Sequence, residues 1–135
     1  MQIYTSSWSQ HTGPGRVGIC SGRPRGAPAG YRMYAPLAPG WDIIKTSPNQ
    51  TAYRARYFGE VLANLDPQKT LDDLIKLAAG HPPVLLCFEK APLHDGNWCH
   101  RTMIGEWLTD KLGIEVREWS GLEESNPTCK VGTLL

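Results

Sequence analysis

The residues best able to do chemistry lie in one short segment, "LLCFEKAPLHDGNWCHR" (85–101). Glu89 and Cys99 are candidate nucleophiles, and His100 is a candidate proton donor and acceptor beside Cys99. Cys99 falls at the start of a predicted helix, where the helix field and neighbouring cations lower the pKa of a thiol. If the chain is an enzyme, we expect Glu89, Cys99 and His100 to be its catalytic residues. The alternative is that Cys99 is a small packed residue without chemistry.

Two basic residues, His100 and Arg101, open the same predicted helix, where the helix dipole disfavours positive charge. The free N–H groups of a first helical turn, together with an arginine fork, bind phosphate or carboxylate groups well. A bound anion would remove the conflict with the dipole, so we expect His100 and Arg101 to bind one. Alternatively, or in addition, Arg101 pairs with Glu89 and braces the strand against the helix.

The periodicity of the chain predicts the elements that position these residues. We expect strands at 2–6, 17–20, 84–89 and 114–119. We expect helices at about 50–65, at 66–80 with Asp66 as its cap, and at 100–112. The run "VLLCFE" is apolar without alternation, as in a strand buried on both faces of a parallel sheet. The prediction is a single-domain, Rossmann-like α/β fold with a mostly parallel sheet flanked by helices.

Residues 21–48 are rich in glycine and proline, and we expect a long loop there, ordered by Tyr31, Tyr34 and Trp41. Ligands of parallel sheets bind at the carboxyl ends of the strands. Further ligand-binding candidates therefore follow the first two strands or precede the last helix, namely Ser6, Ser7, Trp8, Ser21, Arg23 and Trp98. An indole such as Trp8, Trp41 or Trp98 could stack on a base, although loop packing is an alternative for each of them.

Composition limits the classes of function. The 135 residues suggest one domain, with its core at about 2–119 and no structural prediction for 120–135. A net charge of +1 provides no global field for nucleic acid or anionic membranes. We see neither a basic helix nor an aromatic and basic sheet face, and no run long enough to span a membrane. We therefore expect neither a nucleic-acid nor a membrane partner, and leave a homo-oligomer open.

The cysteines, at positions 20, 87, 99 and 129, form no C-x-x-C pair, and no signal peptide opens the chain. We therefore expect a cytoplasmic protein with free thiols. A zinc set of Cys87, His94, Cys99 and His100 lacks the usual ligand spacing. The basic loop "SGRPRG" (21–26) lacks the ending of a P-loop. We expect no metal and no cofactor.

The chain resembles the bacterial and phage domain of unknown function family 488. The similarity runs from about Ile3 to Trp119 and rests on "IYTS", "VGIC", "LAP", "EVLANLDP" and, above all, "LLCFEK" followed by "CHR" and "EWL". The resemblance implies a small parallel α/β fold, with signature positions at Cys87, Glu89, Cys99, His100 and Arg101. It supplies no settled activity. The stretch from 90 to 98 is longer than the linker common in the family.

Three hypotheses of function follow. The first is binding of a phosphorylated, nucleotide-derived small molecule at the strand ends, as in sequestration of a signalling nucleotide. The second is a hydrolase or glycosidic-bond transferase that acts on the same class of ligand through Glu89, Cys99 and His100. The third is a protein-interaction module or inhibitor, whose surface would be an exposed patch of Tyr31, Tyr34 and Trp41.

Overall fold

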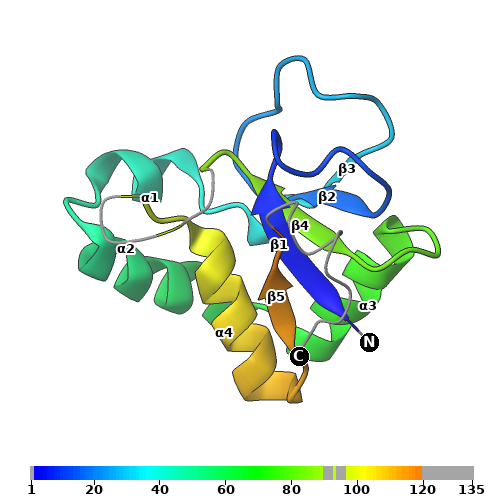
Figure 1. Cartoon of the computed structure of the whole chain (residues 1–135). Coiled ribbons are helices and arrows are strands. Elements are labelled where there is room, and N and C mark those ends of the chain that lie inside the picture. Colours follow the sequence, from blue (N-terminus) through cyan, green and yellow to red (C-terminus); the bar gives the residue numbers. More distant parts are fainter. Residues whose placement is uncertain (1, 90–92, 94–96, 120–135) are drawn as a thin grey trace.

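The computed structural model describes residues 2–89, 93 and 97–119. Within them, five strands form one sheet in the order β3-β2-β4-β1-β5, and every pairing is parallel (Figure 1). The strands are β1 (Ile3–Ser7), β2 (Arg16–Gly18), β3 (Arg32–Met33), β4 (Val84–Cys87) and β5 (Val116–Glu118). The predicted α/β fold with a parallel sheet is therefore confirmed.

Strand β4 lies at the centre of the sheet, between β1 and β2. All four of its residues are buried, as its unbroken apolar pattern predicts. Its register sets Cys87 beside Ser7 of β1 and Leu86 beside Gly18 of β2. The strand ends two residues earlier than expected. Phe88 and Glu89 therefore follow it as exposed residues at the carboxyl edge of the sheet.

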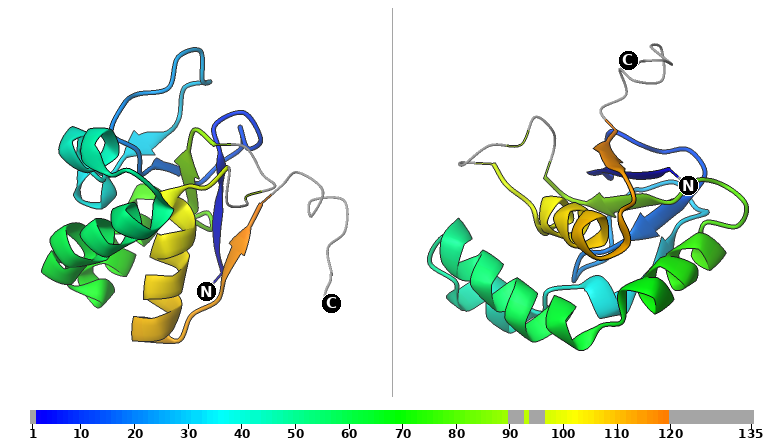
Figure 2. Two further views of the ribbon diagram at one scale, coloured as in Figure 1. Left: turned by 90° about the vertical axis from the view of Figure 1, so that its left-hand side faces the viewer. Right: turned by 90° about the horizontal axis from the view of Figure 1, so that it is seen from below.

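The helices α1 (Trp41–Thr46), α2 (Gln50–Arg56), α3 (Pro67–Leu77) and α4 (His100–Leu112) gather on one side of the sheet (Figure 2). Helix α3 begins as predicted, with the Asp66 carboxylate accepting a hydrogen bond from the backbone N–H of Lys69 at 2.9 Å. Helix α4 has its predicted bounds and ends at Gly113 in the left-handed conformation. The apolar stripe of α4 is buried against the sheet, and it consists of Met103, Ile104, Trp107 and Leu108.

The helix expected at 50–65 is not uniform. After α2 the chain widens into a π-helical turn, η2 (Tyr57–Val61), and then tightens into a 3₁₀ turn, η3 (Leu62–Asn64). Tyr57 and Leu62 are both buried although they are five residues apart. Residues five apart face different directions in an α-helix but lie closer to one face in a π turn. The wide turn therefore allows both side chains to enter the core.

Residues 21–48 are not the single long loop that their composition predicts, because they contain β3, the 3₁₀ turn η1 (Ala35–Leu37) and α1. Side chains from other elements hold this segment. Buried Arg16 donates to the carbonyls of Pro28 at 2.7 Å and Ala29 at 2.6 Å. The buried Tyr57 hydroxyl donates to the Leu37 carbonyl at 2.6 Å. These bonds satisfy backbone groups that have no strand or helix partner.

Among the described residues, no helix is both long enough and apolar enough to cross a membrane. The expected tail at 120–135 lies outside those residues.

Candidate active site

A cleft of about 570 Å³ opens at the carboxyl ends of β2 and β4, beside the first turn of α4. In parallel sheets this edge is the usual place for a ligand. The cleft is lined by Cys20, Ser21, Gly22, Pro39, Trp41, Ile44, Ser47, Tyr53, Cys87, Phe88, Glu89, Asn97, Trp98, Cys99 and His100. Glu89, Cys99 and His100, the three residues predicted to be catalytic, are thus brought to one cleft.

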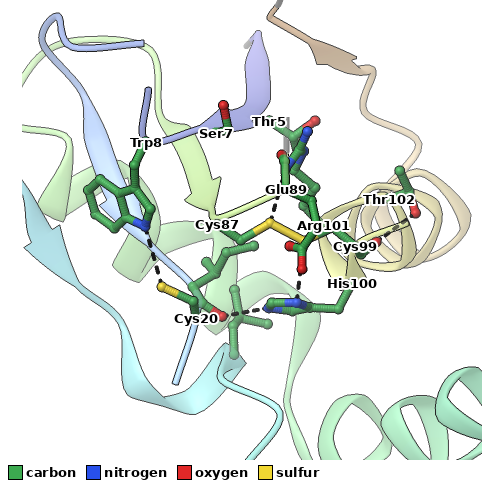
Figure 3. Close-up of a disulfide and its surroundings, with 12 residues drawn as sticks. Thr5, Ser7, Trp8, Cys20, Cys87, Glu89, Cys99, His100, Arg101 and Thr102 are labelled. Atoms are coloured by element: carbon green, nitrogen blue, oxygen red, sulfur yellow. Dashed lines mark hydrogen bonds between the residues drawn. A yellow bond between two sulfur atoms is a disulfide. The ribbon is translucent and has the colours of Figure 1, made fainter. Parts of the chain in front are cut away.

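A disulfide joins Cys87 to Cys99 within this cleft (Figure 3). Cys87 ends β4 and Cys99 is the N-cap residue of α4, with their Cα atoms 7.4 Å apart. The prediction of free thiols is therefore wrong for this pair. Spacing in the sequence could not reveal the disulfide, because the two residues meet only when the strand end and the helix start share one edge of the sheet. Cys20 is a free, buried thiol, and Cys129 lies outside the described residues.

His100 is buried at the start of α4, between the disulfide and the end of β2. Its Nε2 lies 2.6 Å from the Ile19 carbonyl oxygen, which can only accept, so Nε2 carries the proton. Its Nδ1 is then an unprotonated acceptor, 3.6 Å from Cys99 Sγ. Burial, aided by the positive charge of Arg101, lowers the pKa of His100 from 6.5 to about 4, against the opposing effect of the Ile19 bond. His100 is therefore neutral at physiological pH.

Arg101 is fully buried, and its guanidinium group has partners on three sides. Its Nε and Nη2 donate to the two carboxylate oxygens of Glu118 at 3.0 and 2.8 Å. Its Nη1 donates to Cys87 Sγ at 3.1 Å and to the backbone carbonyl of Glu89 at 2.5 Å. The carboxylate partner is thus Glu118 of β5, and not Glu89, which the sequence offered as an alternative to anion binding. With no exposed surface, Arg101 braces the site and does not present its fork to a ligand.

These contacts explain how α4 can begin with two basic residues. His100 is neutral, and the side chain of Arg101 is paired with Glu118. The helix dipole therefore opposes little net charge at this end of α4. The Cys99 side chain accepts no capping hydrogen bond, so it satisfies none of the N–H groups of the first turn.

Five of the eight predicted ligand-binding residues lie outside the lining of the cleft, namely Ser6, Ser7, Trp8, Arg23 and Arg101. Ser6 Oγ donates to the Trp119 carbonyl at 2.6 Å, and Ser7 Oγ donates to the side-chain oxygen of Gln10 at 2.8 Å. Trp8 Nε1 donates to Cys20 Sγ at 3.4 Å, and Trp8 is not among the residues that line the cleft. The strand order accounts for Ser6 and Ser7, because β1 lies on the far side of β4 from β2, whereas the Trp8 indole packs beside Gly18 and Cys20. Sequence alone did not supply that order.

Two other predicted residues do line the cleft. Ser21 Oγ accepts a hydrogen bond from the Gly40 N–H at 3.1 Å, which ties the loop after β2 to the start of α1. Trp98 packs edge-on against Tyr53 with ring centroids 4.7 Å apart. Arg23 is exposed and lies outside the lining.

Aromatic side chains form much of the wall. Trp41 is 56% exposed and Phe88 is 50% exposed, although both are large and apolar. Trp41 was expected to flank the site, whereas Phe88 and Tyr53 were not identified. The apolar pattern predicts that Phe88 belongs to the buried strand, but β4 ends at Cys87 and Phe88 lines the cleft instead. The available signal for the place of Phe88 in the cleft was its position in the sequence, directly before Glu89 at the end of the apolar run.

The aromatic patch expected for a protein-interaction surface does not form. Tyr31 packs edge-on against Trp8 with centroids 5.0 Å apart, and the Tyr34 hydroxyl donates to Asp73 at 2.8 Å. Only Trp41 of the three expected residues is an exposed large hydrophobic side chain. The third hypothesis loses its main support.

Within the described part of the chain, Cys87, Cys99 and His100 are the one group whose ligand atoms could converge on a metal ion, all lying within 4.8 Å of one another. Cysteine binds metals as the thiolate. The two sulfur atoms are bonded to each other here and cannot serve as thiolate ligands in this state. His94, the fourth member of the zinc set considered from sequence, lies outside the described residues.

Comparison with known protein families gives a match over most of the chain. The model of a protein family described as the active DUF488-N3 subclade matches residues 3–112 of this chain. The match runs from β1 to the end of α4 and includes both cysteines of the disulfide, Glu89, His100 and Arg101. It ends before β5, which carries Glu118. Searches of curated proteins and of solved structures found no match.

Proposed function

The chain belongs to the domain of unknown function family 488, and on the geometry of its cleft we propose that it binds a nucleotide-derived small molecule there. The observation that carries the proposal is the exposure of Trp41 and Phe88 on a cleft at the carboxyl ends of β2 and β4. Exposed aromatic faces stack on bases, and each stacked base contributes about 1–3 kcal/mol. A small aromatic ligand would cover side chains that otherwise face water.

A phosphate group on the ligand would bind at the first turn of α4, whose N–H groups receive no side-chain cap from Cys99. This assignment replaces the role expected for Arg101, which is fully buried. The exposed carboxylate of Glu89 also lines the cleft and would repel a phosphate nearby but accept a hydrogen bond from a ribose hydroxyl. We therefore propose that Glu89 faces the sugar.

The binding test is calorimetric titration of the protein with a panel of nucleoside 5′-monophosphates, the corresponding nucleosides and inorganic phosphate. Trp41→Ala and Phe88→Ala should each weaken binding of the best nucleotide about tenfold or more. Phe58→Ala is the matched control, because Phe58 packs against Arg54 and does not line the cleft. Equal effects of Phe88→Ala and Phe58→Ala, or no binding by any member of the panel, would contradict the proposal.

A second function, favoured by one specific contact, is a hydrolase or glycosidic-bond transferase on the same ligand. Cys99 Sγ lies 3.6 Å from His100 Nδ1, and His100 is in turn oriented by the Ile19 carbonyl. A nucleophile, a base and a group that orients the base form the usual arrangement of covalent catalysis. Cys99 can act in this way only after the disulfide has been reduced. The matching subclade is described as active.

The enzymatic hypothesis is tested by turnover. Nucleotides that bind should be consumed by the protein reduced with a phosphine, and Cys99→Ala should abolish consumption without abolishing binding. Cys20→Ala serves as the control, because Cys20 lines the cleft but takes no part in the disulfide. Consumption that is unchanged in Cys99→Ala would exclude the thiol mechanism and leave Glu89 as the candidate nucleophile.

A further inference from the structure

The two sulfur atoms of the disulfide lie in different surroundings. Cys87 Sγ accepts a hydrogen bond from Arg101 Nη1 at 3.1 Å, whereas Cys99 Sγ lies 3.6 Å from His100 Nδ1 (Figure 3). An N–H donor from a cationic group stabilises a thiolate more than a bonded sulfur. An unprotonated imidazole nitrogen can instead take the proton of a thiol. After the disulfide opens, the Arg101 donor therefore favours a thiolate at Cys87, and the His100 nitrogen can take the proton of the Cys99 thiol.

The fold keeps the Arg101 contact in place. Glu118 holds Nε and Nη2, and the Glu89 carbonyl accepts from Nη1, so the guanidinium plane is fixed on Cys87. The carboxylate of Glu118 offsets much of the positive charge, and the remaining effect on Cys87 is that of a directed N–H donor. A directed donor stabilises a charged acceptor more than a neutral one. This contribution favours the state in which Cys87 is a thiolate.

We propose that Cys87–Cys99 is a redox-active disulfide that oxidises low-molecular-weight thiols entering the cleft. A substrate thiolate attacks Cys99 Sγ and forms a mixed disulfide with it. The bond between the two cysteine sulfurs breaks, and its electron pair leaves on Cys87 as a thiolate held by Arg101. A second substrate thiolate attacks the substrate sulfur of the mixed disulfide and releases Cys99, which is reprotonated. Two thiols thus become one disulfide, and the protein gains two electrons and one proton, which Cys99 takes up, while Cys87 stays a thiolate and the second proton passes to solvent.

The size of the substrate follows from burial. Cys87 and Cys99 are 1% and 3% exposed, so they are reached through the cleft and not from the outer surface. A thiol on the surface of another folded protein would not fit into about 570 Å³, whereas a free small thiol would. Attack at Cys99 leaves the better stabilised thiolate, that of Cys87, as the leaving group. Exchange is faster when the leaving thiol has the lower pKa.

A purely structural disulfide is the competing explanation. A disulfide with a sequence separation of 12 residues stabilises a fold by restricting the unfolded chain. Such a disulfide needs neither a hydrogen-bond donor on one sulfur nor a base beside the other. It also resists small thiols until the protein unfolds. The two explanations therefore differ in reactivity under native conditions.

The test uses the full chain with Cys129→Ser as the common background and glutathione as the probe. The oxidised protein is incubated without denaturant in buffers of varied reduced-to-oxidised glutathione ratio, quenched with acid, alkylated and weighed by mass spectrometry. We expect reversible conversion between disulfide and dithiol while circular dichroism stays native. In Cys87→Ser, peptide mapping should find one glutathione on Cys99, and Cys20→Ser should behave as the background protein does.

The role of Arg101 has its own measurement. Arg101→Lys keeps the charge but loses the fork, and it should shift the glutathione equilibrium about tenfold towards the disulfide. If that variant does not fold, the comparison of Cys87→Ser with Cys20→Ser still distinguishes a redox-active disulfide from a structural one. Opening that requires denaturant, or no adduct on Cys99, would overturn the proposal in favour of a structural disulfide. No nucleotide is present in these experiments, so their outcome is independent of nucleotide binding.

Discussion

Arg101 Nη1 donates a hydrogen bond to Cys87 Sγ over 3.1 Å, across the boundary between the central strand and the helix that follows it. Because Arg101 is fully buried, its position depends on Glu118, whose carboxylate accepts from the other two nitrogens. Residues from β4, α4 and β5 are therefore linked by one guanidinium group. The geometry of the site and the stability of this edge of the sheet therefore both depend on the Arg101 guanidinium group.

Loss of the Glu118 charge should destabilise the fold. Glu118→Gln leaves a buried cation without its counter-charge, and we expect a loss of about 3 kcal/mol in the free energy of unfolding. This is the lower end of the usual range, because the Glu118 side chain is 30% exposed. Glu106→Gln is the matched control, since Glu106 holds Arg54 through both oxygens on the exposed surface. For Glu106→Gln we expect a loss of about 1 kcal/mol or less in the free energy of unfolding. Urea unfolding measures both, and equal losses would contradict the assigned role.

The neutral state of His100 should make stability depend on pH. Its pKa is about 4 in the folded protein and 6.5 in the reference state, so between these values the unfolded chain binds the extra proton. Stability should therefore be fully present above pH 6.5 and fall as the pH drops towards 4, by about 3 kcal/mol in total. Urea midpoints measured from pH 8 to pH 4 should show this loss.

His100→Gln isolates the contribution of this histidine. The variant should be less stable at pH 8 because burial and the bond to Ile19 are disturbed, but it should lose less stability on acidification. His81→Gln, at an exposed position, controls for the removal of a histidine. A His100→Gln protein whose stability falls as steeply as that of the wild type would show that His100 is not the group responsible.

Much of the fold could be predicted from particular patterns. The Asp66-Pro67 start of α3, the apolar stripe of α4 and the unbroken apolar run of β4 are local signals, and each was confirmed. What could not be predicted depends on contacts between distant segments. The pairing of Arg101 with Glu118 depends on how α4 packs beside β5, and the Cys87–Cys99 disulfide depends on the end of β4 meeting the start of α4. Likewise, the exposure of Phe88 depends on where β4 ends, and periodicity fixes an element end only approximately.

The hydroxyl of Tyr57 should anchor the segment that carries the aromatic wall of the cleft. It donates to the Leu37 carbonyl at 2.6 Å, and both residues are fully buried. Tyr57→Phe leaves that carbonyl without this donor, and we expect a loss of about 1–2 kcal/mol in the free energy of unfolding. Tyr34→Phe is the control, because Tyr34 is only partly buried and its partner Asp73 also binds Lys69. Urea unfolding should show the smaller loss for Tyr34→Phe.

Gly15 lies where two backbone segments cross, and we expect it to tolerate a side chain poorly. Gly15 has a φ of +84°, and an added Cβ would overlap the Pro82 carbonyl oxygen just before β4. The Gly15 carbonyl also accepts the Val84 N–H at 2.8 Å, so the two backbones cannot separate without loss of that bond. Gly26 has a similar φ of +74°, but an added Cβ there would meet nothing within 4 Å.

Gly15→Ala and Gly26→Ala therefore separate backbone strain from overlap. Both substitutions carry the cost of a left-handed conformation, about 1–2 kcal/mol. Only Gly15→Ala also displaces a backbone segment. We expect Gly15→Ala to lower the free energy of unfolding by about 2 kcal/mol or more beyond the loss in Gly26→Ala. Thermal or urea unfolding of the two variants measures the difference. Because β4 ends at Cys87, displacement of its start should also slow exchange of the Cys87–Cys99 disulfide with glutathione in Gly15→Ala but not in Gly26→Ala.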